Sequence, residues 1–441
     1  FENAPFVSAH DSLDAGTFEI FKGDLLAART GNMDYANVGA PHTMNYLHRT
    51  ISGNCLLIED PEEKWKGFLA GAEGGQDGGG ERTNFPLSGS PDADTYQNYR
   101  DIFQRGRITR FRNEPEFTYA MADLTGAYNN PHFHGGKLNR PKTRSVTRQL
   151  IYLRALDTVL VFDRVNSLKP EFTKTWLLHS LGDLDVLDGT ASKLSEGEIR
   201  YEGATRAVIR YGWPKPVPSF ARCLSVSLLP EHARITKIGG RTDLPAGQKE
   251  SFPGDQWHGQ HQHHHIKDFW VYGTNYPPGD PPETRWFGEP TSSYYVSGTP
   301  DESGGRGKWR LEVSPTEPAL DDVFFHVLCP RLEREGPFPS VSKLTSPPIA
   351  AGTANSAGFD GALIKEGNLQ EAVFFSRAQE LQNAFNAQLP ANPGCALLVS
   401  GLKPGEYQLR SGQNRLANLS VADDGLAIVP QASGAVQILP R

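Results

Sequence analysis

Side chains that can transfer protons or bind anions are concentrated between residues 10 and 49. His10, His42 and His48 carry imidazoles, which titrate near neutral pH and suit proton transfer or the neutralisation of a carboxylate. Tyr46 lies between two of them, and the guanidinium of Arg49 can bind a carboxylate or sulfate through two hydrogen bonds. The alternatives are a histidine that caps a turn, a buried tyrosine and a structural ion pair.

A second group of histidines occurs in the segment HGQHQHHH. His261, His263 and His265 alternate, so on a strand three imidazoles would share one face and could bind a metal ion. Only Asp255 and Asp268 offer carboxylates near them, and no cysteine does. The composition therefore favours a solvated loop over a native metal site.

Basic side chains are concentrated in two further stretches. They are Arg105, Arg107, Arg110 and Arg112, and then Lys137, Arg140, Lys142 and Arg144. On alternating strands they would line a groove for a polyanion. Ordinary solvated strand faces are an equally good interpretation.

The composition excludes several classes of protein. The 441 residues carry a net charge of −7, which argues against nucleic acid as a partner. No apolar run approaches the ~18 residues of a membrane-spanning helix. The 4 cysteines are far apart, so we expect no disulfide scaffold. The chain begins at Phe1 without Met, so we expect either a processed protein or a piece of a longer one.

Short strands that are separated by turn residues recur along most of the chain. The 45 glycines and 33 prolines fit many turns, and the spacing is typical of a large sandwich or of stacked sheets. Strand pairs are predicted around Lys22-Gly23-Asp24, Asn113-Glu114-Pro115 and Ala155-Leu156-Asp157. Single strands are predicted at residues 54–60, 173–181, 207–213, 222–230, 268–276, 308–315 and 322–330. The Gly-rich stretch 71–84 is predicted to be a surface loop rather than a phosphate site.

The composition changes near residue 335. Residues 334–358 are rich in Pro, Ser, Ala and Gly and predict a linker. Residues 377–388 are the best helix candidate, and the alternating segment from residue 395 onward predicts a small antiparallel unit. We therefore predict an all-β chain with a large layered antiparallel β-sandwich at 1–335 and a small C-terminal β-domain at 336–441.

Several segments together resemble the heparinase II/III-like polysaccharide lyase family. HDSLDAG is similar to that family's H-x-H-x-D-A-G segment, and NYLHRTISGN to its Tyr-x-x-Arg-Thr-x-x-His-Asn segment. GRITRFRNEPEFTYAMADLTGAY and RQLIYLRALDTVLVFDRV follow in the family's order, so the resemblance covers about residues 6–330. It implies a β-region that, with an N-terminal (α/α) toroid, encloses a cleft for acidic polysaccharide.

The implied reaction is β-elimination. A base removes the C5 proton of a uronic acid, a neighbouring group neutralises the carboxylate, and an acid protonates the leaving oxygen. That proton is barely acidic until the carboxylate charge is masked, so positioned donors matter most.

Three positions depart from the family's pattern. Ser12 stands where the family has its second His, Arg29 lies where it has Asp, and Gly53 where it has His. In members with a structural metal these positions supply the ligands, and His, Asp and His form a sensible zinc set. We therefore expect no metal and no cofactor here, and we expect the cation of Arg29 to replace the ion's charge.

The resemblance leads to one main hypothesis, a bacterial lyase that is periplasmic or secreted. It acts on a uronic-acid polymer such as alginate or a glycosaminoglycan, has a toroid domain or chain as partner, and has no nucleic-acid or membrane partner. The alternatives are a non-catalytic carbohydrate-binding β-module and a metal-storage protein built on the His-rich loop. The predicted catalytic residues are His10 and Tyr46. The predicted substrate-binding residues are Tyr35, His42, His48, Arg49, Asn54 and Arg29.

Overall fold

The computed structural model describes residues 11–30, 49–62, 79–81, 97–98, 105–129, 140–180, 183–195, 198–211, 221–239, 309–346 and 358–441. These segments are built almost entirely of strands, which confirms the predicted all-β class. Their short helical pieces include η2 (Thr50–Ser52), α3 (Thr125–Asn129) and η6 (Glu333–Glu335). None of the helices among the described residues is long and apolar enough to span a membrane.

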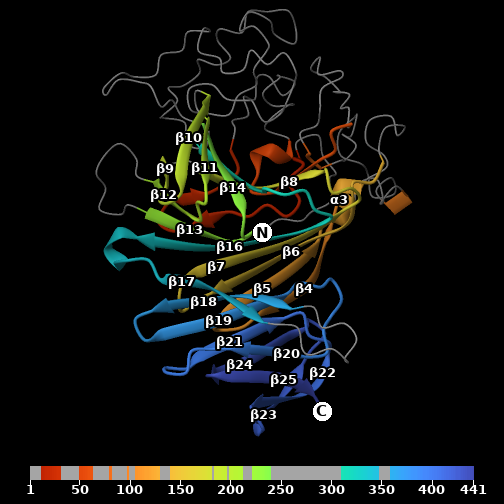
Figure 1. Ribbon diagram of the computed structural model, residues 1–441, viewed down its shortest axis with the longest axis vertical. Helices are drawn as coiled ribbons and strands as arrows, with labels where there is room; N and C mark the ends of the chain where they lie inside the picture. Colours follow the sequence, from red (N-terminus) through yellow and green to blue (C-terminus); the bar gives the residue numbers. More distant parts are fainter. Residues whose placement is uncertain are drawn as a thin grey trace, which may run out of the picture.

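The strands form stacked layers, which run from top to bottom in Figure 1. We call the six-stranded layer at the top the outer sheet. Its strands, in spatial order, are β10 (Thr190–Ser195), β11 (Glu198–Glu202), β14 (Ala233–Gly239), β15 (Trp309–Pro315), β8 (Thr173–Ser180) and β3 (Leu56–Glu59). A two-stranded hairpin of β1 (Ile20–Phe21) and β2 (Leu25–Ala27) turns at Lys22–Asp24, as predicted.

The next layer is the eight-stranded central sheet. Its order is β4 (Arg107–Asn113), β5 (Phe117–Asp123), β6 (Thr143–Leu153), β7 (Thr158–Ser167), β16 (Asp321–Leu332), β13 (Ala221–Leu229), β12 (Arg206–Tyr211) and β9 (Asp183–Val186). The predicted hairpins β4–β5 and β6–β7 are both present, and all neighbours in this sheet are antiparallel.

Two smaller sheets complete the stack. The bridging sheet contains β17 (Ser340–Ser346), β18 (Phe359–Glu366), β19 (Leu369–Ser376), β21 (Cys395–Ser400) and β24 (Leu426–Ala432). The terminal sheet contains β20 (Phe385–Gln388), β25 (Ala435–Pro440), β22 (Gly405–Ser411) and β23 (Asn414–Val421). One pair, β19 with β21, is parallel.

Apolar cores lie between successive sheets, so the central and bridging sheets are buried on both faces. In β7, Val161 packs toward the outer sheet, whereas Phe162 packs toward the bridging sheet. Phe162 stacks on Phe375 of β19 with ring centroids 4.7 Å apart. On the far side of β19, Phe374 contacts Phe385 of β20 at 4.9 Å. This double burial explains why inner strands such as β7, β16 and β21 contain continuous apolar runs instead of alternating ones.

Two local predictions near the C-terminal end are wrong. Residues 385–388 of the predicted helix form β20, in which Phe385 and Ala387 are buried and alternate with two less buried residues. The predicted linker contains a strand, because residues 340–346 form β17 and pair with β18 along its whole length. In both cases, packing against a neighbouring strand outweighs local propensity.

Sheet membership changes after η6, close to the predicted domain boundary. The strands up to β16 belong to the outer and central sheets, and those from β17 onward to the bridging and terminal sheets. The bridging sheet nevertheless shares an apolar core with the central sheet. The division into domains at residue 335 stays a prediction. All four cysteines are buried and unpaired, which agrees with the expected lack of a disulfide scaffold.

Candidate functional site

The described residues include three of the predicted site residues, namely Arg29, Arg49 and Asn54. His10, Tyr35, His42, Tyr46 and His48 lie outside the described residues, as do the His-rich segment at 258–265 and the strand predicted at 268–276. The geometry of the site is therefore built from the described neighbours of the three residues that are placed.

A group of charged side chains gathers around Asp14, and we call it the Asp14 cluster: Asp14, Arg29, Glu81 and Arg105. Arg29 Nη1 lies 3.3 Å from Asp14 Oδ2, and Arg105 Nη1 lies 3.4 Å from Asp14 Oδ1. Arg105 Nη1 also donates to the carbonyl oxygen of Ser12 and lies 3.9 Å from Glu81 Oε2. Four chain segments that are distant in sequence thus meet at one carboxylate.

Glycines let two of these segments approach closely. Gly16, at φ +84, sits against Leu124, whose Cδ1 would be only 2.5 Å from a Cβ at that position. Gly79, at φ +90, lies against the backbone of β3, and its carbonyl oxygen accepts a hydrogen bond from Ile58 N at 2.8 Å. Only glycine adopts this conformation and leaves room for such contact. Gly79–Glu81 are consequently buried, although the Gly-rich stretch was predicted to be a surface loop.

Glu81 carries a carboxyl group in an unfavourable environment. It is 0% exposed, and neither carboxyl oxygen has a hydrogen-bond partner among the described residues. Burial raises the pKa of Glu81 from 4.5 to about 8, and the nearby Asp14 raises it further, against the opposing effect of Arg105. Glu81 is therefore mostly protonated at neutral pH, and the cluster then contains one carboxylate, that of Asp14, between two guanidinium groups.

Asn54 connects the Asp14 cluster to the outer sheet. Its backbone N donates to Thr17 Oγ1 at 3.1 Å, and its Nδ2 donates to the carbonyl oxygen of Phe18 at 2.7 Å. Its Oδ1 accepts from the backbone N of His179 at 2.7 Å. The side chain is 0% exposed, so in this arrangement Asn54 positions its neighbours.

His179, on β8, lies beside Asn54. Its Nδ1 is 3.4 Å from Asn54 Oδ1, while its buried Nε2 has no hydrogen-bond partner among the described residues. Burial holds the pKa of His179 well below 6.5, and the positive charges of Arg310 and Arg29 lower it further. The ring is thus neutral at physiological pH.

Arg29 and Arg49 differ in their access to solvent. The Arg29 side chain is 25% exposed, and its Nε donates to Ser52 Oγ at 3.2 Å. Arg49 is only 3% exposed, and its carbonyl oxygen accepts from Ser52 N at 3.1 Å in the turn η2. Of these two arginines, Arg29 is the one that can meet a ligand without rearrangement.

A buried ion pair supports the cluster from the central sheet. Arg148 binds Asp163 through two hydrogen bonds of 2.7 and 2.8 Å, and both side chains are 0% exposed. Arg148 Nη1 also donates to the carbonyl oxygens of Gly16 and Asn54, each at 2.6 Å. Asp163 therefore has a structural role.

The residues of the cluster do not fit the structural metal of the heparinase II/III-like family. Ser12, Arg29 and Gly53, the three departing positions, all lie around Asp14. A Cβ at Gly53 would be 3.1 Å from Cys55 Sγ and 3.5 Å from Asp14 Cβ, so a histidine there lacks room. Two guanidinium groups already contact the Asp14 carboxylate. Among the described residues, no group of three His, Cys, Asp or Glu side chains could hold a metal ion.

The two basic stretches are used largely for internal contacts. Arg112 pairs with Glu114 at 2.8 Å and with Asp424 of the β23–β24 turn at 3.4 Å. Arg140 binds Asp60 through two hydrogen bonds of 2.9 Å, and Lys142 is buried against the carbonyl oxygen of Gly80. These contacts favour the structural interpretation of the stretches over a polyanion groove.

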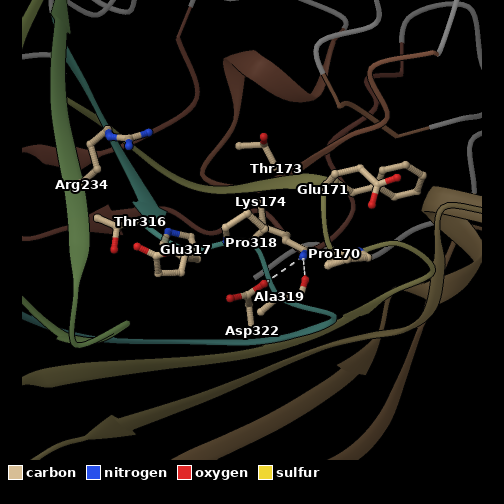
Figure 2. A pocket seen from close by; sticks show the side chains of 12 residues that line it. Pro170, Glu171, Thr173, Lys174, Arg234, Thr316, Glu317, Pro318, Ala319 and Asp322 are labelled. Carbon is tan, nitrogen blue, oxygen red and sulfur yellow. Dashed lines mark hydrogen bonds and ion pairs between the residues drawn. The ribbon is translucent and has the colours of Figure 1, made fainter.

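A separate pocket lies at the opposite end of β8 from His179 (Figure 2). Its cavity of about 110 Å³ is bounded by residues 170–174, by the 315–319 turn, and by Arg234 and Asp322. Lys174, only 2% exposed, pairs with Asp322 at 2.9 Å at the base of the pocket. Figure 2 shows this pair between the Arg234 side chain on one side and Glu171 on the other.

Comparison with known proteins adds a distant structural likeness. No family model and no curated protein matches this sequence. Two solved structures of a heparinase III gene product, one with methylated lysines, have TM-scores of 0.37 and 0.35 and 8% identity. The matches cover 83% of this chain but only 36% and 37% of the solved chains, so this chain spans little more than a third of their length. Similarity of this strength does not define a function.

The sequence hypotheses missed several members of the site. Glu81 lies in a glycine-rich stretch, Arg105 was grouped with a basic stretch, and His179 was not proposed as a site residue within the strand predicted at residues 173–181. Asp14 was present in the quoted HDSLDAG segment but was not singled out. The usable signal was the unusual occurrence of an ionisable residue inside an otherwise glycine-rich or apolar segment.

Proposed function

We propose that this chain is the β-rich, C-terminal part of a polysaccharide lyase that cleaves a uronic-acid polymer by β-elimination. An N-terminal (α/α) toroid would supply the other wall of the cleft, and the protein would act in the periplasm or outside the cell. The observation that supports this proposal most directly is the contact of Arg29 with Asp14. The three positions that depart from the family's motifs lie together around the Asp14 carboxylate.

Arg29 is suited to mask the charge of a substrate carboxylate. Asp14 and Ser52 fix the orientation of its guanidinium, and a quarter of its side chain is exposed. A preorganised cation beside the uronate stabilises the charge that develops as the C5–H bond breaks. The electron pair then forms the C4–C5 double bond, the C4–O bond breaks, and the leaving oxygen takes up a proton.

The two proton-transfer groups remain those proposed from the sequence, His10 and Tyr46. His179 is a buried residue of the outer-sheet strand β8, so we assign it a positioning role toward Asn54. The wider set of proposed substrate contacts is Tyr35, His42, His48, Arg49 and Asn54, and for Asn54 its burial favours an indirect role.

The test measures unsaturated product. The chain, with and without the natural segment that precedes it, is incubated with alginate, heparan sulfate and polygalacturonate, and the ultraviolet absorbance of the unsaturated uronate is followed. We expect activity only with the preceding segment, and a loss of roughly a hundredfold in Arg29→Gln. Arg107→Gln, which removes an exposed arginine of β4, is the matched control and should leave activity unchanged.

Three results would contradict this proposal. Full activity of the chain alone would refute the half-enzyme arrangement. Full activity of Arg29→Gln would refute the role of that residue. Saturable binding of these polymers without any product, even when the preceding segment is present, would favour the non-catalytic carbohydrate-binding module.

A further inference from the structure

The far face of the outer sheet, which points away from the central sheet, carries a row of polar side chains. The strand register places Arg200 of β11 opposite Thr236 of β14, and Arg234 of β14 opposite Glu202 of β11 and Ser314 of β15. The alternate residues of these strands, such as Ile235 and Val313, point into the core. Arg200 and Arg234 are therefore diagonal neighbours on one face, with roughly 7–8 Å between their Cα atoms.

Both arginines lack hydrogen-bond and ion-pair partners among the described residues, unlike most of the other arginines described above. Their buried Nε atoms have no hydrogen-bond acceptor, and neither guanidinium forms an ion pair with any described residue. Their side chains are half-buried, so part of each guanidinium reaches the surface. A buried N–H without an acceptor is unfavourable, and an anion that accepts from Nε and a terminal nitrogen together would relieve it.

Arg234 also borders the pocket of Figure 2, where its side chain extends toward the cavity. The other cation of the pocket, Lys174, pairs with Asp322, so Arg234 is the lining cation that forms no ion pair with a described residue. A cavity of about 110 Å³ holds a few water molecules, taking ~30 Å³ for each, or one substituent of a larger ligand. It can thus hold one carboxylate or sulfate group of a larger ligand beside Arg234.

The remaining lining suggests a saccharide instead of a bare inorganic ion. Glu171 and Glu317 line the pocket and oppose any anionic group there, but they also accept hydrogen bonds from hydroxyl groups, which a saccharide supplies and a bare anion does not. Thr173 and Thr316 add hydroxyl groups, and Phe172 provides an apolar surface. A guanidinium group that is surrounded by hydroxyl groups and hydrogen-bond acceptors is suited to bind an acidic sugar unit.

We propose that Arg234 and Arg200 form a saccharide-binding subsite that holds the carboxylate or sulfate groups of an acidic polysaccharide on the outer sheet. The subsite lies at the opposite end of β8 from His179 and Asn54, so it would bind sugar units away from the site of cleavage. The inference rests on the proposed function only for the nature of the ligand, and it does not require that the chain catalyse a reaction.

The experiment measures binding and not product. The full chain is titrated with oligosaccharides of heparin, of polygalacturonate and of neutral dextran by calorimetry. We expect Arg234→Gln and Arg200→Gln each to weaken binding of the acidic oligosaccharides about tenfold, the effect of losing one charge-assisted contact. Arg107→Gln, the matched control with the same change in net charge, should weaken it less than twofold. Dextran should not bind.

Both arginine variants should keep the wild-type melting temperature, because neither guanidinium has an internal partner to lose. Binding of heparin alone would assign sulfate as the recognised group, and binding of polygalacturonate alone would assign carboxylate. Unchanged affinity in Arg234→Gln, an equal loss in Arg107→Gln, or a wild-type chain that binds neither acidic ligand would overturn the subsite. Arginine-dependent binding without lyase product would leave the subsite standing and refute the proposed reaction.

Discussion

Replacing Glu81 by glutamine should remove a loss of stability that the wild-type protein suffers as the pH rises. Glu81 is completely buried, and Arg105 Nη1 lies 3.9 Å from its Oε2. Burial raises the pKa of this carboxyl group from 4.5 to about 8 in the folded protein. The folded state therefore binds the proton more tightly than the unfolded state does.

The sign and size of the effect follow from linkage. Below pH 4.5 both states are protonated and the full stability is present, whereas between 4.5 and about 8 only the unfolded state releases the proton. The free energy of unfolding should then fall by at most about 1.4 kcal/mol per pH unit, and by on the order of 5 kcal/mol in total, before it levels off. Glutamine keeps the shape of the side chain but has no proton to lose.

Urea unfolding at pH 5, 7 and 9, followed by circular dichroism, measures the effect. Glu81→Gln should match the wild-type midpoint at pH 5 and exceed it increasingly at pH 7 and 9. Glu380→Gln, which changes an exposed glutamate, should follow the wild type throughout. Parallel curves for Glu81→Gln and wild type across this range would show that Glu81 is not protonated in the folded state, and the electrostatic description of the Asp14 cluster would then be incorrect.

Other perturbations have equally direct expectations. Asp163→Asn should lower the free energy of unfolding by about 3–5 kcal/mol, because it leaves the buried Arg148 charge uncompensated. The control Asp185→Asn removes an exposed ion pair and should lower the free energy of unfolding by less than about 1 kcal/mol in the same denaturation assay. Phe162→Ala should cost about 3–5 kcal/mol and loosen the contact between the central and bridging sheets, seen as faster amide exchange in both. A metal chelator should leave the melting temperature unchanged, because the Asp14 cluster holds guanidinium groups where a metal would be needed; a clear decrease would contradict this account.

Local sequence patterns were sufficient to predict those strands for which the run of apolar residues and the turn residues indicate the same structure. The β6–β7 hairpin combines two long apolar runs with a turn in which Asp157 adopts φ +43, a conformation that Asp tolerates. The segment 377–388 was wrongly predicted to be a helix because its alanines, glutamines and leucine favour a helix locally. Burial of Phe385 and Ala387 against β25 overrode that preference, and the pairing partner lies about fifty residues further along the chain.

The candidate site was only partly accessible to the same reasoning. Motif order pointed to Asn54 and to the three positions that depart from the family's pattern, one of which is Arg29. It could not reveal that Glu81 and Arg105 join Asp14, because these contacts span 91 residues for Asp14 and Arg105 and depend on close backbone approaches at glycines. It also could not reveal that Arg200 and Arg234 are unpaired, since that depends on the register of β11 and β14.

By itself, the sequence determined the all-β class, the main hairpins and a set of chemically capable residues, because periodicity and turn chemistry act over a few neighbouring residues. The tertiary structure alone decided the order of the sheets, the burial of Asn54 and His179, the protonation of Glu81 and the lack of partners for two arginines. Each of these depends on which distant groups displace water from a side chain, and no local pattern encodes that.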